Sequence, residues 1–333
     1  MSRVLVALAL AAMSAVASAQ PQVKPPQLTP ISVIVFPGGW NLPIWAAERQ
    51  GFFEQNGLRV TVTPTPSSTF QMQGFAEGRY DIAMTAIDNV IAYQEGQGEA
   101  KIPDNPDMFV FMGGDSGFLS LVGGKGVRNI AELRGKKLSV DAMTTGYAFV
   151  LRELLARSGI AESEVTFERA GGGLQRFQEL LKGSHDGTML IAPFDLLAIN
   201  QGHARLARAD EHLGAYQGVV GATRRSWARE NEAALLGFIR AYHAGVQYVV
   251  DPKNREISEA LLVALAGRTM TPQLARQAAD TLLDPKSGFI RDAAVNMQGV
   301  ATVLALRSKF SGKPLGNPAK YVDPSYRDKA LAR

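Results

Sequence analysis

The side chains best suited to contact a bound molecule stand in short stretches that each follow an apolar run. Gly39-Trp40-Asn41 supplies an aromatic ring and an amide, and its glycine lets the backbone approach a ligand closely. Thr144-Thr145-Gly146-Tyr147 supplies hydroxyl groups and the free backbone N–H groups of a predicted helix start, which attract hydrogen-bond acceptors. These residue types suit the binding of a small solute. For Trp40 the alternative is a half-buried side chain in a turn.

Three further stretches add carboxylates, amides and an aromatic wall. Their candidate ligand-binding residues are Thr85, Asp88, Asn89, Asp115, Ser116, Phe194 and Asp195. Asp88 has a second interpretation, as the cap of the helix that it begins. The glycine run 171–173 is either another loop that approaches the ligand closely or a flexible turn.

Stretches that look like catalytic or metal-binding motifs lack their partners. Residues 114–117 read Gly-Asp-Ser-Gly, as around the nucleophile of chymotrypsin-type proteases, but no histidine precedes His185 to act as the base. The run 123–126 lacks the upstream glycine and the Ser or Thr of a phosphate-binding P-loop. The four histidines form no i, i+4 pair and the chain has no cysteine. We therefore predict no catalytic residue, no metal site and no cofactor.

Composition indicates a globular protein and excludes one class of partner. The chain has 333 residues, of which 46% are hydrophobic and 20% charged, and about 150 residues are typical of one domain. The net charge is only +4, with 35 basic residues dispersed among 31 acidic ones. Nucleic-acid binding needs clustered Lys and Arg to displace counterions, so we predict no nucleic-acid partner.

The N-terminus predicts export from the cytoplasm. Arg3 precedes the apolar run 4–13, and Ala17-Ser18-Ala19 provides the small residues that a signal peptidase requires. The apolar run is shorter than the ~20 residues that span a bilayer. We therefore expect a signal peptide (1–19) that is cleaved after Ala19, a Pro- and Gln-rich linker over 20–30, and a mature protein in the periplasm.

Strands and helices alternate behind the candidate stretches and must position them. Strands are predicted at 31–36, 58–63, 80–86, 136–141, 165–168 and 188–192, with helices between them. This alternation is typical of an α/β fold with mostly parallel sheets, in which loops at the carboxyl ends of strands form the ligand site. From residue 227 the pattern is helical, at 227–250, 256–266, 272–282 and about 289–308. A polar tail from Gly312 is expected to lie on the surface.

A weak internal repeat indicates two similarly built halves. In each half a helix gives way to a strand at the pattern Gly-x-x-Asp, at residues 78–81 and again at 183–186. An earlier helix also ends at a glycine in each half, Gly57 and Gly159. The same elements lie between these landmarks, so we predict two lobes of like construction.

The stretch 43–58 (PIWAAERQGFFEQNGL) resembles the opening of periplasmic binding proteins for nitrate, sulfonate, taurine and thiamine-pyrimidine precursors. Residues 75–88 and 129–140 add further matches. The resemblance implies a type II-like fold with two α/β lobes joined by two crossing segments, which close over the ligand like a hinged clamp. On this chain the crossings would lie near 114–121 and 217–223. Lobe one would then be 31–115 plus 221–333, and lobe two 116–220.

The resemblance implies a solute-binding component of an ABC-type importer, a monomer that delivers a small molecule to a membrane permease. The predicted strand-end loops carry Asp88, Asp115, Asp141 and Asp195 and no basic residue. Because unpaired carboxylates repel an anion in a desolvated cleft, we predict a neutral or amine-bearing, ring-containing, pyrimidine-like ligand.

Three alternatives remain open at this point. The first is a sulfonate or nitrate binder, and the second is a sensor domain that feeds a membrane kinase. The third is a periplasmic enzyme on the same fold, acting on a heteroaromatic or acyl substrate. The pyrimidine synthases of yeast type resemble this fold, but their cysteine-rich motif is missing here.

Overall fold

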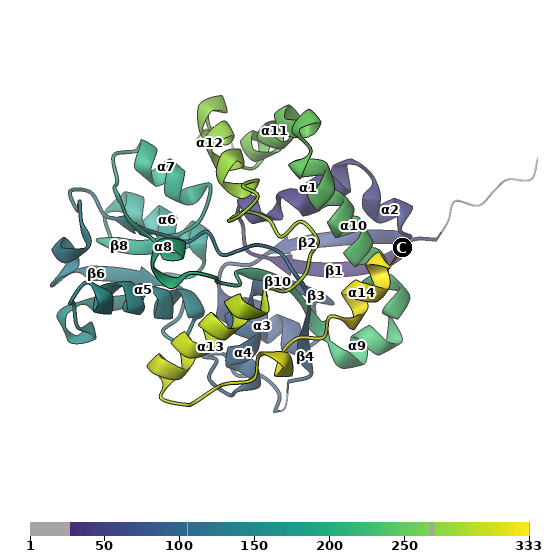
Figure 1. The fold of residues 1–333 in the computed structure, drawn as a ribbon, viewed down its shortest axis with the longest axis horizontal. Helices are drawn as coiled ribbons and strands as arrows, with labels where there is room; N and C mark the ends of the chain where they lie inside the picture. The colour runs from purple at the N-terminus through teal and green to yellow at the C-terminus, as the bar shows by residue number, and fades with distance from the viewer. Residues whose placement is uncertain (1–26, 105, 267–269, 333) are drawn as a thin grey trace, which may run out of the picture.

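Two five-stranded sheets form the framework of the computed structural model, which describes residues 27–104, 106–266 and 270–332 (Figure 1). The first has the order β2-β1-β3-β10-β4 and contains β1 (Thr29–Val35), β2 (Leu58–Pro64), β3 (Ile82–Ala86), β4 (Met108–Gly113) and β10 (Val219–Arg224). The second has the order β7-β6-β8-β5-β9 and contains β5 (Ser120–Gly123), β6 (Lys137–Val140), β7 (Thr166–Arg169), β8 (Gly187–Leu190) and β9 (Arg205–Arg208).

The N-terminal predictions fall largely outside this part of the chain. The expected signal peptide (1–19) and most of the expected linker (20–30) lie outside the described residues. The end of that linker is corrected by the structure, because β1 already begins at Thr29 and pairs with β2 from its first residue.

The predicted α/β fold is confirmed, and both sheets are mixed, with one strand in each running against the other four. In the first sheet β1 is parallel to β2 and β3, and only β10 runs against its neighbours β3 and β4. In the second sheet β6 is parallel to β7 and β8, and only β5 runs against β8 and β9. The two strand orders are therefore equivalent, with β1, β2 and β3 corresponding to β6, β7 and β8.

The repeated Gly-x-x-Asp pattern does the same structural work in both sheets. The Asp81 carboxylate accepts a hydrogen bond from Ser32 N at 2.8 Å, and Asp81 N donates to Ser32 O at 2.9 Å. The Asp186 carboxylate accepts from Lys137 N at 3.0 Å, and Asp186 N donates to Lys137 O at 2.7 Å. Each aspartate thus ties the entry of one strand to the backbone of the strand beside it.

Helices cover both sheets. The first sheet carries α1 (Leu42–Arg49), α2 (Phe52–Gln55), α3 (Ser68–Ala76) and α4 (Ile87–Gln94). The second carries α5 (Gly146–Arg157), α6 (Gly173–Lys182), α7 (Phe194–Asn200) and α8 (Ala209–Leu213). The C-terminal part adds α9 (Arg225–Glu230), α10 (Glu232–Val250), α11 (Arg255–Ala266), α12 (Pro272–Leu282), α13 (Met297–Ser311) and α14 (Ser325–Leu331). In the part that the structure describes, no helix is both long and apolar enough to cross a membrane.

The apolar core explains why these elements form. Strand β1 buries Ile31, Val33, Ile34 and Val35, as expected for a central strand covered on both faces. Helix α10 packs on this sheet through Phe238, whose ring stacks on Phe53 at 5.7 Å between centroids.

The C-terminus differs from its prediction in two ways. The helix expected over about 289–308 begins only at Met297. The tail is anchored rather than draped, because Tyr321 is 2% exposed and Val322 forms a bridge with Val110. Helix α14 then packs against α10 and β4.

The chain passes between the sheets twice. Residues 114–119 lead from β4 to β5, and residues 209–218, which include α8, lead from β9 back to β10. The segment 217–223, expected to cross, lies mainly in β10. We call β1–β4, β10, α1–α4 and α9–α14 lobe one, and β5–β9 with α5–α8 lobe two. Lobe two lies on the left and lobe one on the right of Figure 1.

Candidate ligand-binding site

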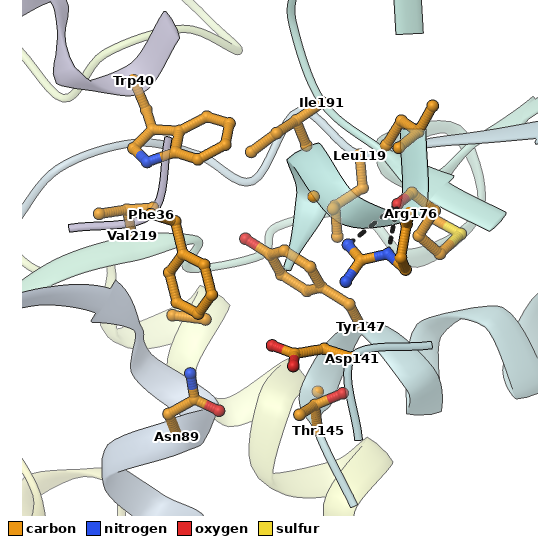
Figure 2. Close-up of a pocket in the computed structure, with 15 residues that line it drawn as sticks. Phe36, Trp40, Asn89, Leu119, Asp141, Thr145, Tyr147, Arg176, Ile191 and Val219 are labelled. Carbon is orange, nitrogen blue, oxygen red and sulfur yellow. Dashed lines mark hydrogen bonds between the residues drawn. The ribbon is translucent and has the colours of Figure 1, made fainter. Parts of the chain in front are cut away.

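A pocket lies between the two lobes, at the strand ends where the candidate stretches were expected (Figure 2). Lobe one contributes Phe36, Trp40, Ala86, Asn89 and Val219. The first crossing contributes Leu119, and lobe two contributes Asp141, Thr145, Gly146, Tyr147, Gly173, Arg176, Met189, Leu190 and Ile191. We call this the inner pocket. It is mostly apolar with a few polar groups, which is the usual make-up of a small-molecule site.

Trp40 forms one wall of the inner pocket. Its indole folds back over Gly38, where a Cβ atom would lie 2.0 Å from the ring, so only glycine is accommodated there. The ring meets Phe194 edge-on, with centroids 6.4 Å apart. Trp40 is 4% exposed, and its Nε1–H has no hydrogen-bond partner among the described residues. A buried donor without a partner is costly, and a ligand acceptor would remove that cost.

The N-terminal turn of α5 forms the opposite wall. Thr145 Oγ1 donates to Ala142 O at 3.0 Å, which fixes the turn, and Gly146 lies against lobe one, where its Cβ would come within 2.6 Å of Asp88 Cβ. Figure 2 shows the Tyr147 hydroxyl pointing into the inner pocket. Burial raises the pKa of Tyr147 far above its ordinary value, so this hydroxyl stays protonated and can donate as well as accept.

Two charged side chains, Asp141 and Arg176, complete the inner pocket. Both Asp141 oxygens accept from Ser68 N of lobe one, at 3.1 and 3.0 Å, and burial raises the pKa of this carboxyl. The Arg176 guanidinium donates to Met189 O and to Gly171 O. Within the described residues no carboxylate lies close enough to form an ion pair with Arg176, which is 4% exposed. The inner pocket therefore holds one acid and one base.

Several predicted site residues lie together here. Trp40, Asn89, Thr145, Gly146 and Tyr147 line the inner pocket. Gly39, Asn41 and Phe194 line a second chamber on the other side of Trp40. Thr85 is buried behind Asn89, and its hydroxyl accepts from Asn89 Nδ2 at 2.9 Å.

Asp88 does not line the inner pocket and does not cap α4, and it pairs with an arginine far along the chain. Arg307 binds it through Nε–Oδ1 and Nη2–Oδ2 contacts of 2.8 and 2.6 Å, and both side chains are at most 1% exposed. The Asp88 side chain makes no cap hydrogen bond to α4. Arg307 also donates to Thr144 O at 2.5 Å, so Thr144 contributes its carbonyl to this contact between lobes and does not line the inner pocket.

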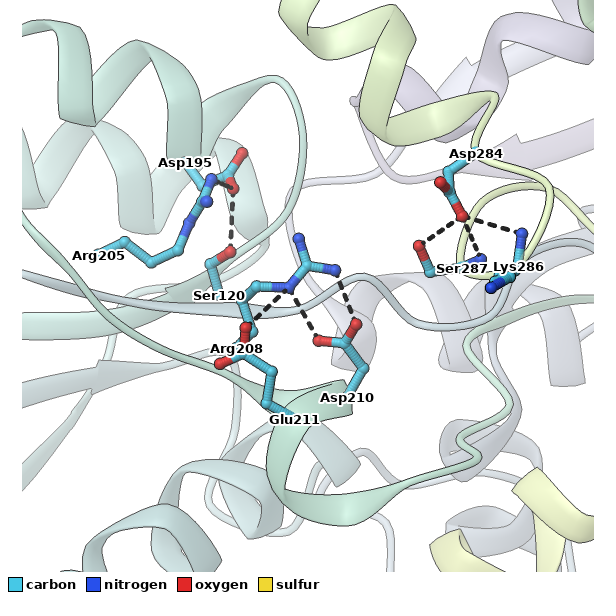
Figure 3. A network of polar contacts seen from close by, with 9 residues as sticks. All are labelled: Ser120, Asp195, Arg205, Arg208, Asp210, Glu211, Asp284, Lys286 and Ser287. Atoms are coloured by element: carbon cyan, nitrogen blue, oxygen red, sulfur yellow. Dashed lines mark hydrogen bonds and ion pairs between the residues drawn. The ribbon is translucent and has the colours of Figure 1, made fainter.

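Asp195 also lies outside both cavities. Its carboxylate accepts from Arg205 and from Ser120 Oγ, each at 3.0 Å (Figure 3). This side chain is 2% exposed and holds α7 against β5 and β9. The sequence placed it correctly at a strand end, but it could not show that Arg205 would pair with it.

Asp115 and Ser116 belong to the first crossing segment. Asp115 Oδ1 accepts from Gly117 N at 2.8 Å and from Val219 N at 3.1 Å, which joins the two crossings. Its Oδ2 is buried without a partner in the described part of the chain. Ser116 N donates to Gly288 O. Neither side chain lines the inner pocket.

Two important residues of the inner pocket were not among the candidates. Asp141 directly follows β6, and the strand-end rule alone would have selected it. Arg176 stands with Gly173, Phe177 and Leu180 on one face of α6. An arginine on the apolar face of an amphipathic helix is a signal for a buried, functional cation. Among the described residues, no three His, Cys, Asp or Glu side chains come together as a metal site.

Comparison with known proteins places the chain in a family. A family model described as NMT1/THI5 like matches residues 41–255. The chain belongs to the NMT1/THI5-like family. The resemblance seen in residues 43–58 is confirmed, since the match covers this stretch. No curated protein is similar enough in sequence to be recognised as a relative of this NMT1/THI5-like chain.

Solved structures show which fold this NMT1/THI5-like protein has. The periplasmic nitrate-binding protein NrtA from Synechocystis PCC 6803 is similar with a TM-score of 0.76 and 12% identity, over 93% of this chain and 90% of that one. The ligand binding component of an ABC-type import system from Staphylococcus aureus gives a TM-score of 0.73 and 13% identity, over 91% and 99%. The alkanesulfonate-binding protein SsuA from Xanthomonas axonopodis pv. citri gives 0.69 and 14%, over 90% and 97%. The predicted fold of a periplasmic binding protein is thereby confirmed.

Proposed function

We propose that the protein is the solute-binding component of an ABC-type importer and binds a small organic molecule in the inner pocket. The observation that carries this proposal is a pocket lined by both lobes, with hydrogen-bonding groups from each facing the same space. Such a pocket couples ligand binding to closure of the lobes. Structural neighbours described as binding components of nitrate, alkanesulfonate and ABC-type import systems support the same role.

The inner pocket favours a ring-containing ligand that carries an amino group. Phe36, Trp40 and Tyr147 offer aromatic surfaces. The Asp141 carboxylate faces the pocket and suits an amine or amino group, while Trp40 Nε1 suits a ring nitrogen or carbonyl. The inner pocket holds one acid, Asp141, and one base, Arg176, and so carries no net charge. This favours a neutral ligand, or a ligand whose positive group pairs with Asp141 and whose negative group pairs with Arg176.

A ring would be held with the lobes slightly further apart than in this structure. The inner pocket has a volume of about 40 Å³, which is enough for only a few waters. Admission of a ligand therefore requires the lobes to part, and the two crossing segments are the places where the chain can bend.

The second candidate is an importer of a small anion, and Arg176 is the observation that favours it. The sequence argument found no basic residue in the predicted loops, but Arg176 enters the inner pocket from α6. Three of its N–H groups donate to backbone carbonyls, which solvate the guanidinium, and the carboxylate that acts on its charge is Asp141. An anion at Arg176 would also approach Asp141, which is why we rank this candidate below the first.

We propose binding without catalysis. Asp141 is tied to Ser68 N, Arg176 is tied to backbone carbonyls, and Tyr147 stays protonated. None of these groups is activated as a nucleophile by a neighbouring base. We also propose that the protein works as a monomer in the periplasm and delivers its ligand to a membrane permease. Deletion of the gene should then abolish cellular uptake of the ligand.

Calorimetry with three probes tests the ligand class. We expect 4-amino-2-methylpyrimidine to bind, and taurine and nitrate to bind at least tenfold more weakly. Asp141→Asn should weaken pyrimidine binding by about ten- to hundredfold, because a hydrogen bond to a charged group is worth about 1.5–3 kcal/mol. Asp186→Asn is the matched control, since that carboxylate also accepts from a backbone N–H but lies away from the pocket. Tight binding of nitrate or taurine would establish the second candidate instead.

A further inference from the structure

A second chamber lies beside the inner pocket, on the other side of Trp40. Both lobes line it, with Val35, Pro37 and Val62 from lobe one and Leu174, Phe177 and Phe194 from lobe two. Its volume is about 620 Å³, within the usual range for small-molecule sites. The chamber is therefore large enough for a ring or a chain of several carbons, and its walls are mostly apolar.

The two cavities are neighbours along three segments of the chain. In each segment one residue lines the inner pocket and the next residue lines the second chamber. These pairs are Phe36 and Pro37, Trp40 and Asn41, and Gly173 and Leu174. Between them stand the ring of Trp40 and the edge-on ring of Phe194. A Cβ on Gly173 would meet both rings at 3.8–3.9 Å. The partition is thus made of side chains, and a rotation of one of them connects the cavities.

Asn41 lines the second chamber, and its side-chain oxygen is buried without a hydrogen-bond donor among the described residues. Asn41 is 1% exposed, and its Nδ2 donates to Phe36 O at 2.7 Å, which fixes the orientation of the amide. Its Oδ1 is consequently directed away from Phe36, and it has no hydrogen-bond partner in the portion of the chain described. An unpartnered, buried carbonyl oxygen is destabilising unless a donor arrives.

We infer that the second chamber is a further subsite of the cleft, which binds an apolar extension of the ligand and offers Asn41 Oδ1 to an N–H or O–H group where that extension begins. This inference rests on the proposed function, because it places the polar head of the same ligand in the inner pocket. The ligand class is then an amphiphile, with an amino-bearing polar ring joined through an N–H or O–H group to an aryl ring or alkyl chain. Such a ligand would bring partners to Trp40 Nε1 and Asn41 Oδ1 together.

The chamber itself is tested with N-phenyl-1-naphthylamine, an uncharged aryl compound with one N–H donor whose fluorescence rises in apolar surroundings. We expect saturable binding at one site per chain. Leu174→Trp fills the chamber and should weaken binding at least tenfold. Leu181→Trp is the matched control, because it places the same side chain on the same helix at a residue that lines neither cavity. Absence of saturable binding, or equal binding by the two variants, overturns the subsite.

A homologous series separates this inference from the proposed function. With 4-aminopyrimidines that carry a 5-alkyl chain of increasing length, each methylene buried in the chamber should raise affinity about three- to fourfold. Leu174→Trp should remove this gain and leave the unsubstituted parent unaffected. If the parent binds and chain length has no effect, the subsite is refuted while the proposed function stands. If no pyrimidine binds but the naphthylamine does, the polar head is wrongly assigned while the chamber stands.

Discussion

Trp40 offers both a stacking surface and an unpartnered N–H group, and two substitutions separate these contributions. Trp40→Ala should weaken ligand binding by about 1–3 kcal/mol, since a buried aromatic contact is lost. Trp40→Phe keeps an aromatic ring and loses the N–H donor, so ligand binding should weaken by about 0.5–1.5 kcal/mol. Titration calorimetry measures both, with Trp227→Phe on α9 as the control. Unchanged affinity in a folded Trp40→Ala protein would remove Trp40 from the site.

Asp115 should give the protein a pH-dependent stability. Burial raises the pKa of Asp115 from 3.8 to about 6, so the folded state holds the proton more tightly than the unfolded state does. Stability from this residue is therefore greatest at low pH and is lost as the pH rises through about 6, by up to about 3 kcal/mol. The substitution Asp115→Asn removes the cost of burying a charged carboxylate and keeps an oxygen acceptor for Gly117 N and Val219 N.

The measurement is chemical unfolding of wild type and Asp115→Asn between pH 4 and pH 8. Asp115→Asn should be the more stable protein at pH 8 and should lose that advantage toward pH 4. The surrounding Tyr147, Tyr216 and Tyr242 do not titrate in this interval, because burial raises the pKa of each well above its ordinary value. If the two proteins differ in free energy of unfolding by the same amount at every pH, the charge on the buried Asp115 does not destabilise the fold at neutral pH.

Among the elements, α13 of lobe one combines a buried ion pair within its own lobe with a contact to lobe two. Arg307 of this helix pairs with Asp88 of α4 and donates to Thr144 O ahead of α5. Arg307→Met should lower the free energy of unfolding by about 3–5 kcal/mol, because it leaves Asp88 charged and buried without its partner. Lys309→Met, on the same helix, breaks a half-exposed ion pair with Glu153 and should cost less than about 1 kcal/mol.

Denaturant titrations compare the two variants of α13. A double variant, Arg307→Met with Asp88→Leu, should regain much of the lost stability, because it removes the orphaned charge as well. Equal, small losses in both single variants would mean that the buried pair contributes little to the stability of the fold.

At the scale of the whole molecule, the lobes touch through contacts that can be released. Ser68 N donates to Asp141 across the cleft, Glu99 pairs with Arg169, and Gly172 N donates to Pro66 O. We expect these contacts to open in the ligand-free protein in solution, so saturating ligand should decrease the radius of gyration measured by solution scattering, toward a closed form slightly wider than this structure. Glu99→Ala removes one of these contacts and should raise the radius of the ligand-free protein. Superimposable curves with and without ligand would contradict a hinge.

The amino-acid sequence by itself determined the alternation of strands and helices, the family and the equivalence of the two halves. These properties depend on local sequence patterns. The stretch 43–58 has a recognisable order of residues. The Gly-x-x-Asp pattern recurs in both halves, and its aspartates, Asp81 and Asp186, each bond the backbone of a neighbouring strand. Strands β4 and β10, of six residues each, and strands β5 and β9, of four residues each, were not predicted. All four stand next to the two crossings, and strands derive their stability from paired neighbours, which a local pattern does not show.

Only the tertiary structure decided which charges remain free to meet a ligand. Four aspartates stood at predicted strand ends, and the sequence made Asp88, Asp115 and Asp195, but not Asp141, candidate ligand-binding residues. Folding brings Arg307 to Asp88, Arg205 to Asp195 and the start of β10 to Asp115, which leaves Asp141 facing the inner pocket. It also carries Arg176 into the same space from the buried face of α6. Asp88 and Arg307 are separated by 219 residues, and a pairing over such a distance is fixed by the packing of whole elements, which no local pattern encodes.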